Sequence, residues 1–165
     1  MIFFAIAILF AFLISSGPIK RMFVKSVTTD INQFKDFISN DFLSSNKYQV
    51  TSLVSYPAIT NANEFPLLDF RCIQCENSYE FYIKAKYFEK LPKQTFNWCD
   101  KKQYPLLIKT SDTPLYIIIG VGGASHFPDQ LFLIPFRDTD SSSFDTTALT
   151  KYSVIFNTSI DFSKY

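Results

Sequence analysis

Five consecutive apolar residues, Leu115-Tyr116-Ile117-Ile118-Ile119, constrain the fold of this chain more than any other segment. A half-exposed strand alternates apolar and polar side chains, whereas a strand that is covered on both faces is apolar throughout. Gly120 ends the run after a length that suits a strand better than a buried helix. The segment therefore predicts a central strand in a sheet that other elements cover on both faces.

Apolar residues elsewhere show the spacing of one long helix and several strands. Ile31, Phe34, Phe37, Ile38 and Phe42 recur every three or four residues, which predicts a helix over residues 29–44. Extended patterns predict strands at 48–59 and 131–136, a hairpin formed by 67–73 and 79–88, and edge strands at 154–156 and 160–162.

The stretches between these strands supply the remaining helices. Residues 100–110 lie where a crossover helix fits, although Pro105 would make that helix start late or kink. Residues 139–143 are typical of a polar loop, and 146–152 of a short helix. We therefore expect an α/β fold, a mixed central sheet flanked by helices.

The first nineteen residues contain no charged side chain, and as a helix they are about long enough to cross most of a bilayer. Lys20, Arg21 and Lys25 follow directly, a bias that holds the rest of the chain in the cytoplasm. We expect a membrane anchor at 1–19, a basic flank at 20–28 and one globular domain at 29–165. The lipid bilayer is then a partner, and the location is the inner or plasma membrane. A secretion signal is the alternative for 1–19, although it would lack the usual basic start.

Composition limits the classes of function. The chain has 165 residues and 47% of them are apolar, which suits one compact domain and excludes a disordered protein. The formal net charge is +1, so no global field draws the protein to nucleic acid. Any contact with DNA must come from a local patch.

Three polar positions stand in a suggestive order along the expected sheet. Asp69 lies in the first strand of the hairpin, Lys84-Ala85-Lys86 lies in the second, and Gln103 lies at the start of the crossover. Over residues 30–136 this order resembles the restriction-endonuclease-like superfamily, the PD-(D/E)xK nucleases, and its Mrr-like members in particular. The resemblance implies a Mg²⁺-dependent endonuclease in which Asp69 binds the metal, Lys86 positions the attacking water and Gln103 supports the site.

Lys84 departs from that pattern, because it stands where the family carries its second metal-binding acid. Residues two apart on a strand share a face, so Lys84 and Lys86 should project together, and an added ammonium repels a cation. Asp100, at the mouth of the crossover, is the candidate that replaces the lost carboxylate. Alternation on a half-exposed strand explains both lysines equally well without any chemistry.

These observations leave two hypotheses of different class. The first is a membrane-tethered nuclease-like domain, degenerate in its metal site, that binds or cleaves DNA. Lys90, Lys93, Lys101 and Lys102, interleaved with aromatic residues such as Phe96 and Trp98, are its candidate phosphate contacts. The second is a non-catalytic anchored domain that recognises a protein partner through its aromatic surface. The lysines themselves are also typical of a solvated face.

The cysteines offer a weaker alternative site. Cys72 and Cys75 have the spacing of half a zinc ribbon, and Cys99 and His126 are the only residues left to complete it. Nothing in the spacing brings the two halves together, so we favour reduced thiols over zinc.

Overall fold

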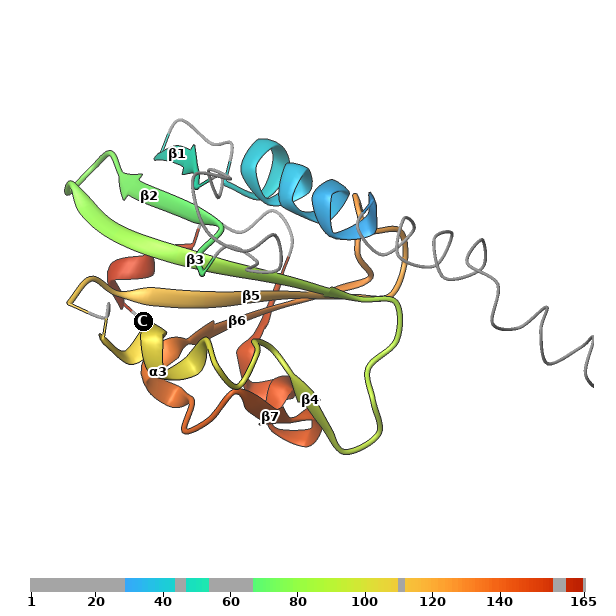
Figure 1. The fold of residues 1–165 in the computed structure, drawn as a ribbon. Helices are drawn as coiled ribbons and strands as arrows, with labels where there is room; N and C mark the ends of the chain where they lie inside the picture. Colours follow the sequence, from blue (N-terminus) through green and yellow to red (C-terminus); the bar gives the residue numbers. More distant parts are fainter. Residues whose placement is uncertain (1–28, 44–46, 54–66, 110–111, 156–159, 165) are drawn as a thin grey trace, which may run out of the picture.

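The computed structural model describes residues 29–43, 47–53, 67–109, 112–155 and 160–164. Six strands form one mixed sheet in the order β1-β2-β3-β5-β6-β8, in which β3 and β5 are parallel and the other neighbours are antiparallel (Figure 1). The strands are β1 (Tyr48–Ser52), β2 (Phe70–Gln74), β3 (Tyr79–Phe88), β5 (Leu115–Val121), β6 (Gln130–Pro135) and β8 (Ser153–Val154). A second, two-stranded sheet pairs β4 (Thr95–Asn97) with β7 (Ser143–Asp145).

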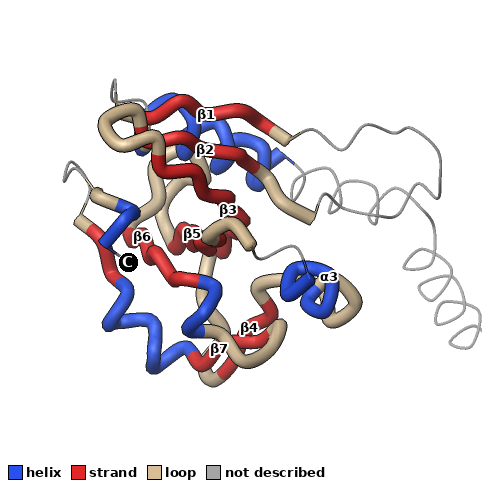
Figure 2. Tube along the Cα trace, turned by 90° about the vertical axis from the view of Figure 1, so that its left-hand side faces the viewer, coloured by secondary structure: helices blue, strands red, loops and turns tan. Residues whose placement is uncertain are grey.

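Different elements cover the two faces of the large sheet. Residues 29–37 form an α-helix that continues as the π-helix η1 (Ile38–Phe42), and it lies on one side. The small β4–β7 sheet and α3 (Tyr104–Lys109) lie on the other side, as Figures 1 and 2 show from two directions. The connection from β3 to β5 runs through β4 and α3, as a parallel pair requires.

The central strand confirms the prediction made from its apolar run, since every residue of β5 is buried. Tyr116 and Ile118 belong to the core under the helix, whereas Ile117 and Ile119 belong to the core on the opposite face. The mixed α/β architecture with a covered central sheet is therefore confirmed.

Most of the remaining predicted elements are also present. β2 and β3 form the expected antiparallel hairpin, and Ser78 in its turn takes a left-handed φ of 56°. The first helix occupies 29–42 of the predicted 29–44. Pro105 is the second residue of α3, a position in the first turn where its missing N–H costs nothing, so the crossover helix starts late.

One prediction about the later chain is wrong. The edge strand at 160–162 is wrong, because Phe162 begins the 3₁₀-helix η4 (Phe162–Lys164) and its ring stacks on Phe81 with centroids 4.2 Å apart. The short helix predicted at 146–152 is present as the 3₁₀-helix η3 (Thr146–Tyr152), and β7 begins at Ser143, the last residue of the predicted polar loop 139–143. β8 holds the predicted edge position at Ser153–Val154. Residues 54–59 of the predicted strand 48–59 lie outside the described residues.

No helix in the described part of the chain is both long and apolar enough to cross a bilayer. The predicted anchor at 1–19 and the basic flank at 20–28 lie outside that part.

Gly120 is expected to tolerate no side chain, because the Phe34 ring fills the space above it. A Cβ at position 120 would lie 2.7 Å from Cζ of Phe34, which is fully buried and cannot swing away. Gly120→Ala should lower the free energy of unfolding by about 1–3 kcal/mol, measured by urea denaturation. In a Phe34→Leu background the same change should cost less, and an equal cost in both backgrounds would contradict the contact.

Candidate functional site

The site begins where β2 ends and β3 continues. Phe70 is the first residue of β2 and pairs with Ile83, so residues 84–88 of β3 extend past it. Asp69 immediately precedes β2, and its backbone N–H donates to the carbonyl of Ile83. Its side chain then accepts the next N–H of β3, from Ala85 to Oδ2, at 2.8 Å. The carboxylate is therefore fixed at this end of the hairpin.

Two lysines from different elements surround the Asp69 carboxylate. Nζ of Lys35, on the first helix, lies 2.6 Å from Oδ1, and Nζ of Lys84, on β3, lies 3.7 Å from Oδ2. The side chain of Asp69 is 1% exposed, against 26% for Lys35 and 10% for Lys84. Both carboxylate oxygens of Asp69 therefore contact protein groups, and the carboxylate is almost completely shielded from water.

Burial gives Lys84 an unusual electrostatic environment. Desolvation is the largest cause that lowers its pKa, and repulsion from Lys35 and Lys86 lowers the pKa further. Attraction to Asp69 opposes these effects but does not cancel them. Lys35 and Lys84 therefore share the single carboxylate of Asp69 at the floor of the site.

This cluster lies in a cleft with a cavity volume of about 1390 Å³. The first helix contributes Lys35 to its lining, β3 contributes Lys84 and Lys86, and residues 97–103 form a further wall. Nζ of Lys86 lies 5.8 Å from the centroid of the Phe88 ring. The structure thus brings Lys84 and Lys86 into one cleft with Asp69, as predicted, but it is Lys84 that forms the ion pair.

Asp100 and Gln103 also line the cleft. Asp100 stabilises the local backbone there. Its Oδ1 accepts the backbone N–H of Lys102 at 2.8 Å, and its carbonyl accepts the N–H of Gln103 at 2.9 Å. These bonds shape the turn that leads into α3.

The donor set does not fit Mg²⁺. That ion prefers several oxygen ligands in octahedral geometry, and the described residues contain no group of three or more His, Cys, Asp or Glu side chains placed to hold a metal. Asp69 already binds two ammonium groups and one amide, and the cation would have to displace Lys35 or Lys84. Lys84, in the position of the expected second acid, is the physical reason for the misfit.

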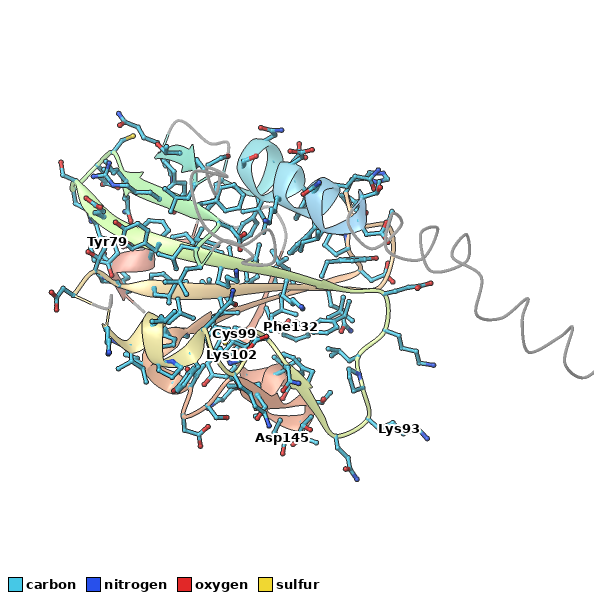
Figure 3. All side chains as sticks on the ribbon, viewed as in Figure 1. Tyr79, Lys93, Cys99, Lys102, Phe132 and Asp145 are labelled. Carbon is cyan, nitrogen blue, oxygen red and sulfur yellow. The ribbon has the colours of Figure 1, made fainter. Side chains whose placement is uncertain are left out.

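The four predicted phosphate contacts fall into two groups. Lys101 and Lys102 line the cleft, and Figure 3 shows Lys102 beside Cys99. Lys90 and Lys93 are exposed on the segment between β3 and β4, where the figure places Lys93 at the outer end of the loop. Phe96 and Trp98 belong to the core, so stacking of bases on them is not supported.

The cysteines occupy dissimilar settings. Cys72 is fully buried, which raises its pKa to about 12, whereas Cys75 is exposed in the hairpin turn. Cys99 lines the cleft with a pKa that burial raises to about 11, and His126 is exposed. Because metals bind the thiolate, burial of this kind works against metal binding at Cys72 and Cys99.

Lys35 is the site residue that sequence reasoning missed. It follows Phe34 and precedes Ile38 by three positions, so it borders the apolar stripe of the first helix. Its position in the helical repeat, next to the apolar face, could have predicted that Lys35 lies near the sheet. Nothing in the sequence, however, links position 35 to position 69.

Comparisons with known proteins give little further guidance. No family model matches the chain, and no curated protein matches it. Among solved structures, the chain is similar to Hjc, a Holliday junction resolvase from the archaeal hyperthermophile Archaeoglobus fulgidus. The TM-score is 0.46 at 13% identity, over 74% of this chain and 95% of that chain. At this similarity the comparison assigns neither a family nor residue roles, so the chemistry of the cleft decides the function.

Proposed function

We propose that this chain is a membrane-anchored, nuclease-like domain that binds nucleic acid and has lost the metal site needed to cut it. The observation that carries the proposal is the contact of Lys35 and Lys84 with the buried carboxylate of Asp69. The hairpin that presents Asp69 opposite Lys84, followed by Lys86 on β3, supports a degenerate member of the restriction-endonuclease-like superfamily, of the Mrr-like type.

The two ammonium groups replace the charge of a divalent cation but not its chemistry. A metal ion polarises the phosphoryl oxygen and lowers the pKa of a bound water, which creates the nucleophile. An ammonium donates hydrogen bonds and neutralises charge, but it has no open coordination site. The cleft can therefore hold a phosphate, while the step that breaks the phosphodiester bond lacks its catalyst.

Five lysines and five acidic side chains line the cleft, and the lysines among them are the candidate contacts to a nucleic-acid backbone. Lys84 lies at the floor, Lys86 lies further along β3, and Lys101 and Lys102 reach the same cleft from the segment before α3. Lysines that contact phosphates release counterions, which makes binding sensitive to salt and indifferent to base sequence.

The test measures binding of a labelled single-stranded oligonucleotide to the full-length protein in mild detergent. EDTA removes divalent metal ions, and fluorescence anisotropy reports the binding. Wild type should bind, and Lys84→Gln should weaken binding by about tenfold, the loss expected for one charge-assisted hydrogen bond. Lys93→Gln removes an exposed lysine outside the cleft and should change affinity much less. Supercoiled plasmid should stay intact in Mg²⁺.

Two results would contradict the proposal. Nicking of plasmid by wild type in Mg²⁺ would show an active nuclease. The absence of any binding in EDTA would favour the alternative hypothesis, an anchored domain that recognises a protein partner.

We also propose that residues 1–19 anchor the domain, which then lies on the cytoplasmic side of the inner or plasma membrane. The support is the uncharged, apolar segment and the basic residues Lys20, Arg21 and Lys25 that follow it. A reporter fused after Tyr165 should be active in the cytoplasm. Activity only outside the cytoplasm would overturn this orientation.

A further inference from the structure

Lys84 differs from a surface lysine in where its amine lies. Its side chain is only 10% exposed, and it lines the cleft of about 1390 Å³ instead of projecting into bulk water. A lysine that is desolvated beside other cationic groups is more readily neutral, and the neutral amine is the form that attacks carbonyl carbon. Lys84 therefore lies where a lysine can react with an aldehyde bound in the cleft.

The contacts of Asp69 are divided unequally between its two lysines. Nζ of Lys35 lies 2.6 Å from Oδ1, the distance of a short charge-assisted hydrogen bond, and the N–H of Ala85 donates to Oδ2 at 2.8 Å. Nζ of Lys84 lies 3.7 Å from Oδ2, which is longer than such a bond. Lys35 and the β3 backbone therefore hold the carboxylate, and its ion pair with Lys84 is the weaker contact.

The electrostatic surroundings of Lys84 agree with this geometry. Burial is the largest cause that lowers its pKa, and repulsion from Lys35 and Lys86 lowers the pKa further. Attraction to Asp69 and Cys99 raises the pKa without reversing the direction of the shift. Because five lysines and five acidic side chains line the whole cleft, its overall charge selects no ligand. The feature that can select one is the reactivity of this amine.

A nucleic-acid strand offers an aldehyde wherever a sugar has lost its base. The ring of that sugar opens to an aldehyde at C1′, and the missing base makes it the smallest part of a strand that could reach the floor of the cleft. Lys101 and Lys102 line the same cleft and can contact the flanking phosphates. Cleavage by elimination at such a sugar needs an amine and a base, whereas hydrolysis needs the metal that this site does not fit.

We propose that Lys84 forms an imine with the aldehyde of an abasic site, and that the domain opens the strand there without a metal ion. This inference rests on the proposed function, because the bound strand delivers the aldehyde to the cleft.

The reaction uses only the amine, one carboxylate and water. Nζ of neutral Lys84 attacks C1′, and the adduct loses one water to form the imine. Asp69, whose Oδ2 lies 3.7 Å from Nζ, then takes a proton from C2′, which is two bonds from that nitrogen. The C3′–O bond breaks, its electron pair leaves with the oxygen, and the downstream strand departs with a 5′-phosphate. Water hydrolyses the imine and frees Lys84.

The experiment uses the full-length protein in EDTA with a labelled single-stranded oligonucleotide that carries one abasic site. Cyanoborohydride delivers a hydride to the imine and converts it to a stable amine, so the protein should become covalently attached to the strand. Without cyanoborohydride, the strand should be cut at the abasic site. A strand of the same sequence with a tetrahydrofuran in place of the abasic sugar has no aldehyde and should give neither product.

Variants and peptide mapping assign the reacting amine. Lys84→Arg keeps a positive charge beside Asp69 but has no amine that forms an imine, so both products should be lost. Lys151→Gln removes an exposed lysine of η3, outside the cleft, and should leave both products unchanged. Mass spectrometry of the trapped wild type should find the sugar on Lys84, which keeps the test valid even where Lys84→Arg fails to fold.

Each contrary outcome has a distinct meaning. Binding of the intact oligonucleotide without either product from the abasic strand would overturn the imine and leave the proposed function in place. No binding of any strand would overturn both. Attachment of the sugar to Lys84 and Lys151 in equal amounts would overturn the inference, because any lysine would then serve. Labelling of Lys84 by glyceraldehyde 3-phosphate as fast as by the abasic strand would overturn the strand as the source of the aldehyde.

Discussion

Asp69→Asn should lower the free energy of unfolding by about 3 kcal/mol, the largest effect expected of any polar substitution in this domain. Removal of one partner from a buried ion pair costs about 3–5 kcal/mol, because the remaining charge is left without compensation. We expect a value at the lower end of this range, because the Lys35 side chain is 26% exposed and water partly compensates its charge. Asparagine still accepts the N–H of Ala85, so the change isolates the lost charge. Urea denaturation provides the measurement.

A surface ion pair in the same hairpin is the matched control for this prediction. Nε of Arg71 donates to one oxygen of Glu80 at 2.7 Å, and an Nη donates to the other oxygen at 2.8 Å. Because both side chains are well exposed and water screens their charges, Arg71→Gln should lower the free energy of unfolding far less than Asp69→Asn does. The double variant Asp69→Asn/Lys84→Met should recover part of the lost stability, since it removes one of the two uncompensated charges. Equal losses for Asp69→Asn and Arg71→Gln would show that the Asp69 contacts are not the buried pairs described above.

Lys84→Glu should weaken metal-free oligonucleotide binding by roughly 100-fold. The substitution removes one ammonium and adds one carboxylate, so a phosphate contact is lost and a repulsive group faces the phosphate. We assign about tenfold to each of these two changes, the size expected for one charge-assisted contact. Lys93→Glu makes the same change of net charge on the exposed loop and should weaken binding far less. Comparable losses in the two variants would mean that only the overall charge of the protein matters.

The same substitution should also create affinity for Mg²⁺. The carboxylate introduced by Lys84→Glu would lie opposite Asp69 on the neighbouring strand, with Lys86 two residues along the same face. Mg²⁺ sites in proteins are commonly built from one or two carboxylates together with water. Plasmid nicking that appears in Lys84→Glu with Mg²⁺ and disappears in Lys84→Glu/Lys86→Ala would support a decayed nuclease site. Nicking that persists in the double variant would come from a contaminant or from another site.

Patterns that depend on local periodicity were predictable from the sequence. Three features depend only on residues that are neighbours in the sequence. They are the apolar run of β5, the spacing of apolar residues every three or four positions in the first helix, and the polar turn between β2 and β3. The 3₁₀-helix at Phe162–Lys164 was not predictable from the sequence. The Phe162 ring packs against Phe81 and Tyr116, which are distant in the sequence. The short strands β4 and β7 are three residues each, too few to show a period.

In the candidate site, too, some residues were predictable from the sequence and others were not. Asp69, Lys84 and Lys86 were found because strand alternation and hairpin register place them at one end of the sheet. Lys35 was missed because its role depends on how the first helix packs beside β3, where Phe34 contacts Tyr87 with ring centroids 5.7 Å apart. The outcome at Lys84 also required coordinates. The resemblance predicted an acid where the sequence has Lys84, and only the structure shows that Lys84 and Lys35 both contact Asp69.

The most direct test is the affinity of wild type for a single-stranded oligonucleotide, measured from EDTA to millimolar Mg²⁺ at constant ionic strength. If ammonium groups take the place of the metal, the affinity should not rise across the titration, and competition of Mg²⁺ for the phosphates should lower it. An affinity that rises with Mg²⁺ in wild type, and no longer rises in Asp69→Asn, would show that this carboxylate binds a metal after all.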